Sequence, residues 1–127
     1  MKRAHLLAHL LIPVLFVLVA LFMSLRSRPF SGELLVSHLV WGYPFYTAPH
    51  LVWAGLSSAL RPSLVVWHSG FVASSGSLLF VGAMSIWGPR DPSGLPYQWL
   101  IYWPLCGLLL AAILGVWYLS GRPHAST

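Results

Sequence analysis

The stretch LLAHLLIPVLFVLVALFMSL, Leu6–Leu25, decides the fold class of this chain. It carries no formal charge when its histidine is neutral, and the nearest basic residues are Arg3 before it and Arg26 after it. About twenty apolar residues in an α-helix cross the roughly 30 Å of hydrocarbon in a bilayer. We therefore expect a first transmembrane helix over 6–25. We expect it to remain as an anchor, because no small-residue cleavage site follows the apolar run.

The composition of the whole chain favours the same solvent. Of its 127 residues, 57% are apolar and 7% are charged, whereas soluble globular domains carry about 25% charged residues. Seven Lys and Arg against two acids give a net charge of +5. These basic residues are spread singly or in pairs rather than clustered on one stripe, so we expect no nucleic-acid partner. The expected partner is the lipid bilayer.

Three further uncharged stretches follow the first span. We expect spans at approximately 47–60, 63–88 and 97–120, and an aromatic, interfacial lead-in over 30–46 before the first of these. Pro44 and Pro49 each remove a helical hydrogen bond, so the second segment is expected to be kinked rather than straight. These segments are too long and too uniformly apolar for the strands of a barrel. The sequence predicts an all-α membrane protein, a bundle of four transmembrane helices in a single integral membrane domain over 1–127.

The charges that flank the spans indicate an orientation. Four spans place both termini on the same side of the membrane. The basic start at Lys2 and Arg3 favours the cytoplasmic side, because the charges around the first helix usually weigh most. A Leu-rich first span after a basic start suits a bacterial inner membrane.

Two histidines near the turn between the second and third spans are candidate cofactor ligands. His50 precedes Arg61 by eleven residues and His68 follows it by seven, so in antiparallel helices their depths differ by only about 6 Å. Ionisable residues inside a span are functional candidates. A facing pair can ligate a haem b or relay protons. The alternative is that each imidazole bonds a neighbouring hydroxyl or carbonyl as a satisfied buried group.

The third stretch carries a row of small residues. Small residues spaced by four let helix backbones approach closely. The candidate packing residues are Ser69, Gly70, Ala73, Ser74, Gly76 and Ser77. The alternative is that Ser74, Ser75 and Ser77 line a polar path in a small oligomeric transporter or channel.

Patterns for catalysis, nucleotide binding and metal binding are missing from the sequence. Glu33 and Asp91 are the only acids and neither lies in a predicted span, so a nucleophile has no base and orienting acid to pair with. Cys106 is the only cysteine, which excludes an intramolecular disulfide and a Cys-rich metal site, and we expect it to be a small packing residue. The favoured interpretation is a non-catalytic accessory or structural subunit that packs in a homo-oligomer or a larger membrane complex. The alternatives are a haem- or quinone-contacting membrane anchor that uses His50 and His68, and the transporter or channel.

Short motifs also suggest a family. They are Tyr46-Thr47-Ala48-Pro49-His50-Leu51-Val52, Ser75-Gly76-Ser77-Leu78-Leu79-Phe80, and Pro104-Leu105-Cys106-Gly107 followed by Gly115-Val116-Trp117. In these motifs the region 46–121 resembles the YgdD-like family of small four-helix membrane proteins, related to transmembrane protein 256. The resemblance implies a membrane fold and marks His50 as a motif position, and it implies no reaction. The family's Gly-Ala-x-Gly-Ala-His-Gly stretch is replaced here by 22–28.

Overall fold

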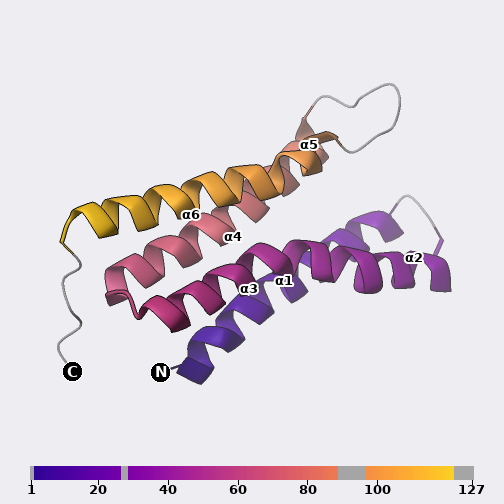
Figure 1. Ribbon diagram of the computed structural model, residues 1–127. Helices are drawn as coiled ribbons and strands as arrows, with labels where there is room; N and C mark the ends of the chain where they lie inside the picture. Colours follow the sequence, from indigo (N-terminus) through magenta and orange to yellow (C-terminus); the bar gives the residue numbers. More distant parts are fainter. Residues whose placement is uncertain (1, 27–28, 89–96, 122–127) are drawn as a thin grey trace. The chain divides into compact units, whose positions relative to one another are not determined.

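The computed structural model describes residues 2–26, 29–88 and 97–121. Over these ranges the chain is helical apart from short connections and forms no strand, which confirms the predicted all-α class. The helices are α1 (Lys2–Leu25), α2 (Gly32–Val36), η1 (Ser37–Gly42), α3 (Tyr43–Leu60), α4 (Leu64–Trp87), α5 (Tyr97–Leu100) and α6 (Tyr102–Leu119) (Figure 1). They form two compact units, Met1–Ala54 and Gly55–Thr127.

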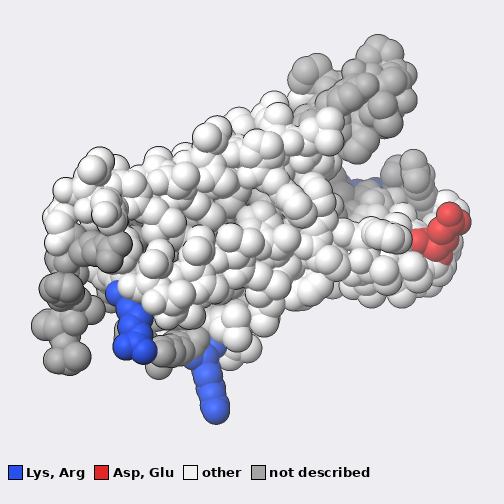
Figure 2. Space-filling model, viewed as in Figure 1, with Lys and Arg blue, Asp and Glu red and all other residues white. Residues whose placement is uncertain are grey.

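Three helices are long and apolar enough to cross a membrane. They cover Arg3–Leu25, Leu64–Trp87 and Tyr102–Leu119. In each of these helices, between 17% and 33% of the most apolar 18-residue stretch is buried. Most of its apolar side chains therefore face outward. Charged side chains occupy little of the face shown in Figure 2. Soluble proteins rarely expose contiguous apolar surfaces of this extent, and these helices therefore suit a lipid surrounding.

The second predicted span differs from the other three. α3 is not among the helices that are apolar enough to cross a membrane. Its 18 residues include Pro44, Thr47, Pro49 and His50, which lower its apolar character. Three of the four predicted spans are therefore supported, and the crossing by α3 stays a prediction.

The second segment, which was predicted to be kinked by its prolines, is a continuous helix with a π-helical section. α2, η1 and α3 follow one another directly, so the chain is helical from Gly32 to Leu60. η1 is a π-helix, in which the amide of Tyr43 bonds to the carbonyl of His38. In an α-helix the ring of Pro44 would clash with the carbonyl four residues earlier. The wider π turn just before this proline changes that register, so the helix continues through the proline.

The start of this second segment is fixed by a side-chain cap. Ser31 has an extended backbone and its hydroxyl accepts a hydrogen bond from the amide of Leu34 at 3.1 Å. Such a cap satisfies one of the amides that the first helical turn leaves without a partner. The helix therefore begins at Gly32, shortly after α1 has ended.

In the second unit, α4 and α6 lie side by side and run in opposite directions (Figure 1). α6 buries one face, which carries Tyr102, Cys106, Leu110 and Trp117. The Sγ atom of Cys106 lies 3.7 Å from the Oγ atom of Ser74 on α4, which joins the two buried faces. Cys106 is a free, buried thiol, so its predicted role as a small packing residue is confirmed.

The predicted span over 97–120 is divided into two helices. α5 ends at Leu100, Ile101 intervenes, and α6 begins at Tyr102. Pro104 is the third residue of α6. Within the first turn of a helix a proline costs no hydrogen bond, because the first amides have no helical acceptor.

Candidate functional site

Two buried imidazoles face each other in the first unit. His9 on α1 and His50 on α3 are both 0% exposed. Their ring centroids are 5.6 Å apart, and the ring planes cross at 71°. His9 shares one face of α1 with Pro13 and Val17, which are also buried and follow it at intervals of four. This pair, in a part of the chain without charged residues, forms the candidate site.

Aromatic contacts hold α1 against the second helical segment beside the histidines. The hydroxyl of Tyr43 donates to the backbone carbonyl of Leu10 at 3.4 Å. The rings of Phe16 and Tyr46 meet edge to face, with centroids 4.9 Å apart. All four residues lie within about two helical turns of His9 or His50 along their own helices. The two imidazoles are therefore placed by contacts of the same interface.

The other histidines described in the structure have different surroundings. The Nδ1 atom of His38 lies 2.9 Å from the carbonyl of Leu34, and its Nε2 atom lies 3.3 Å from the hydroxyl of Ser24. His38 therefore ties η1 to the end of α1. His68 is exposed on α4, and its ring lies edge-on to Trp67 with centroids 4.9 Å apart.

The predicted pairing of His50 with His68 joins residues of the two units and stays a prediction. The structure places His9 beside His50 instead. His9, which lies near the start of the predicted first span, was not among the candidate residues predicted from the sequence. Its spacing of four from Pro13 is the signal that would have placed it on a packed helix face.

A metal site of the usual composition is absent from the described part of the chain. Among those residues no three or more His, Cys, Asp or Glu side chains are grouped closely enough to hold a metal ion. A structural zinc site needs four such ligands.

The small residues predicted for packing fall into two environments. Gly70, Ser74 and Ser77 are buried, Ala73 is partly buried, and Ser69 and Gly76 are exposed. The hydroxyl of Ser74 donates to the carbonyl of Gly70 at 3.0 Å, and that of Ser77 donates to the carbonyl of Ala73 at 2.7 Å. These two donors are directed to the helix backbone rather than to a solute path. Their burial suits packing within the second unit.

A second row of small residues lies on the exposed side of α6. Gly107, Ala111 and Gly115 are spaced by four and all are exposed. A Cβ atom built at Gly107 or Gly115 would meet nothing within 4 Å. Sequence reasoning missed this row, although the spacing alone contains the signal. It leaves a flat strip on α6 that no other described helix of the second unit covers.

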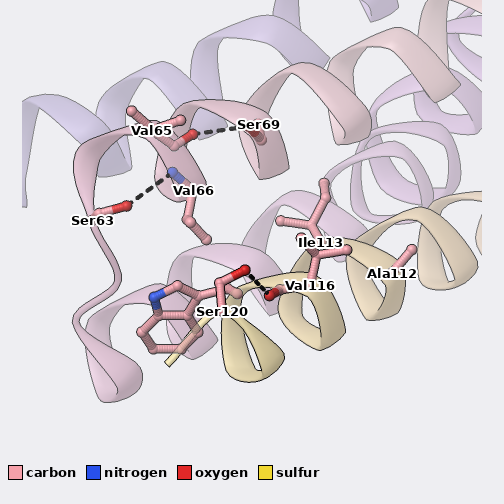
Figure 3. A pocket seen from close by; sticks show the side chains of 9 residues that line it. Ser63, Val65, Val66, Ser69, Ala112, Ile113, Val116 and Ser120 are labelled. Carbon is pink, nitrogen blue, oxygen red and sulfur yellow. Dashed lines mark hydrogen bonds between the residues drawn. The ribbon is translucent and has the colours of Figure 1, made fainter. Parts of the chain in front are cut away.

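An open groove of about 420 Å³ lies between the start of α4 and the end of α6 (Figure 3). Its walls are mainly apolar and include Val65, Val66, Ala112, Ile113 and Val116. Three serines also line it, and each bonds to its own helix. Ser63 accepts from the amide of Val66, Ser69 donates to the carbonyl of Val65, and Ser120 donates to the carbonyl of Val116. The groove suits an apolar chain such as a lipid tail better than a polar solute.

Comparison with known proteins gives no relative. No protein family, no curated protein and no solved structure matches this chain. The resemblance to the YgdD-like family therefore stays a prediction, and the function has to be argued from the site itself.

Proposed function

We propose that this chain is a non-catalytic integral subunit of a bacterial inner membrane that works by helix packing, with further copies of itself or within a larger membrane complex. The observation that supports this best is the exposed row Gly107, Ala111 and Gly115 on α6. The proposal includes α3 as a fourth crossing and both termini on the cytoplasmic side.

The physical argument rests on what drives helices together in lipid. Lipid tails are as apolar as leucine, so close van der Waals packing replaces the hydrophobic effect between helices. Small residues at intervals of four allow two backbones to approach closely enough for such packing. On α6 the exposed side chain of Leu108 lies beside the row. The row itself forms a shallow strip that fits a second helix.

Two differently tagged copies of the chain, expressed together, test the packing. After extraction in mild detergent we expect the copies to purify together. Gly107→Leu and Gly115→Leu fill the strip and should abolish this association. Ala112→Leu is the matched control, because it adds the same side chain to an exposed small residue on another side of α6.

The opposite outcome would contradict the proposal. The chain would then purify alone, without a second copy or a stoichiometric partner, while showing an activity of its own. If both glycine variants still purify with a second copy, the row Gly107, Ala111 and Gly115 is not the surface through which the copies associate.

An electron-transfer anchor is the second candidate function. The observation that favours it is the complete burial of His50, one of the two predicted ligands. The predicted version uses His50 and His68 as the axial ligands of haem b. The purified protein would then show a b-type spectrum on dithionite reduction, and His50→Ala and His68→Ala would each lose it. A spectrum without a Soret band, in protein from haem-sufficient cells, would end the haem version.

A further inference from the structure

Helix packing through α6 leaves the two buried imidazoles of the first unit without a role. Placing an ionisable side chain in an apolar segment is costly, and such residues usually mark an ion path or a binding site. Here two of them occupy the same interface, with rings in contact. We propose that His9 and His50 together bind one soft monovalent cation, with Cu(I) as the physiological ion. This inference does not depend on the packing function.

The spacing of the rings suits one metal ion between two nitrogen atoms. An imidazole–metal bond is about 2.0 Å long. With about 1.1 Å from each ring centre to its nitrogen, a two-coordinate ion needs ring centroids about 6 Å apart. The observed separation is 5.6 Å, so the rings have to part by about half an ångström to admit the ion. The rings meet edge to face at 71°, so one of them also has to turn about its side-chain bonds until a nitrogen of each ring faces the ion.

The lack of charged residues in the segments that carry the pair favours a monovalent ion over a divalent one. Both imidazoles must be neutral to bind a metal, and the sequence has no charged residue between Arg3 and Arg26 or between Glu33 and Arg61. A divalent ion would keep its full charge in an apolar surrounding. The cost of burying an ion grows with the square of its charge, so a divalent ion costs about four times as much as a monovalent ion of the same size.

The number and kind of ligands select a soft d¹⁰ ion. Zinc sites take four protein ligands, or three and a water, and calcium takes six to eight oxygen atoms. Among the described residues, no third His, Cys, Asp or Glu side chain is grouped closely enough with the pair to complete a metal site. Cu(I) and Ag(I) accept two ligands in a line, and imidazole is a suitable ligand for copper.

The same interface is too tightly closed for a haem. A macrocycle between His9 and His50 would extend along both helices for more than one turn in each direction. The ring pair Phe16–Tyr46 and the hydrogen bond from Tyr43 to Leu10 lie within that reach. Both contacts would have to open to admit a macrocycle, whereas a bare ion leaves them intact.

Retention of silver by the purified chain tests the site. Silver(I) is the probe because it is soft, monovalent and stable in air, and Cu(I) under a reductant repeats the test anaerobically. All variants carry Cys106→Ala, which removes the one competing thiol. The protein in detergent is mixed with silver nitrate and desalted, and metal per chain is measured by mass spectrometry. Thermal melting checks the fold of each variant.

We expect one equivalent of silver in the Cys106→Ala parent and at least a tenfold loss in His9→Phe and in His50→Phe. His9→Met should retain the ion, because a thioether is also a soft ligand. His68→Phe is the control and should bind as the parent does. X-ray absorption of the Cu(I) form should show two nitrogen neighbours.

Four results would overturn the proposal. The first is a folded parent that retains no silver, and the second is a Phe variant at either position that retains the full equivalent. The third is an equal loss of silver from the His68→Phe control, which would mean that the losses do not report on the pair. A Soret band in the purified chain that disappears in His9→Phe would also refute it and assign the pair to haem.

Discussion

Shortening Leu110 in α6 tests whether α4 and α6 pack as the structure describes. Leu110 is 5% exposed and lies on the buried face of α6, whereas Leu108 is 71% exposed. Leu110→Ala removes side-chain atoms from the contact with α4. Leu108→Ala removes the same atoms from the outward face. Both changes alter helix propensity equally, so the difference between the variants isolates the packing.

The expected size of the effect depends on the solvent. In water-soluble cores Leu→Ala costs about 2.7–5.0 kcal/mol, which combines a transfer contribution with a cavity contribution. In lipid the transfer contribution largely disappears, because the tails are as apolar as leucine. The cavity contribution remains, at about 24 cal/mol per Å³. We expect Leu110→Ala to lower the free energy of unfolding by about 1–3 kcal/mol, and Leu108→Ala to change it by less than about 0.5 kcal/mol.

The single thiol of the chain provides the assay. Cys106 is buried on the same face of α6, one turn before Leu110. A maleimide reaches it only when α4 and α6 separate, so the labelling rate follows the population of the opened state. A loss of about 1–3 kcal/mol raises that rate about 5- to 150-fold, and the control should stay within about twofold of the wild type. Unfolding midpoints in SDS should rank the variants in the same order.

Two results would refute the argument. If Leu108→Ala accelerates labelling as much as Leu110→Ala, the two faces of α6 are not distinguished by packing. If neither variant changes the labelling rate or the SDS midpoint, Leu110 does not hold the helices together.

Substitutions at three further positions test local features. Arg61 has a φ angle of 49°, a conformation that favours glycine. In SDS titration we expect Arg61→Gly to stabilise the protein by up to about 1 kcal/mol and Arg61→Val to destabilise it by a similar amount. Ser31→Ala removes the cap on Leu34 and should cost about 1 kcal/mol, seen as faster hydrogen exchange at that amide, and unchanged exchange would contradict it. Pro44→Ala should let η1 relax to an α-helix, and the resulting rotation should break the contact of His38 with Ser24; NMR spectra with that contact preserved would show that the π turn has another cause.

The positions of the long helices could be predicted well from the sequence. The predicted span over 63–88 agrees within one residue at each end with α4, Leu64–Trp87, and the first span is likewise a helix. The length of an uncharged run fixes such an element, because a helix that crosses lipid must satisfy its backbone internally. The predicted kink in the second segment stays a prediction, although the segment is helical throughout. The rule for proline describes a clash in an α-helix, and the π turn at η1 avoids that register.

The candidate site could be predicted only in part. His50 was singled out, and it is buried. Its partner was sought at equal depth on the next helix in sequence, because only that comparison can be made without a tertiary structure. His9 comes from a helix that is separated from α3 by η1 and α2, and its burial depends on how α1 packs. Contacts between helices that are not joined by a tight turn do not appear in the spacing of residues.

The two proposals concern different parts of the chain, and this makes them separable. The small-residue strip lies on α6 of the second unit, and the histidine pair lies on α1 and α3 of the first. If each part acts alone, Gly107→Leu should bind silver as the parent does, and copies with His9→Phe should still purify together. If Gly107→Leu loses the silver while its fold is intact, binding requires the assembled form. The strip on α6 would then control the metal site, and association of the subunits would be the event that creates a competent pair of imidazoles.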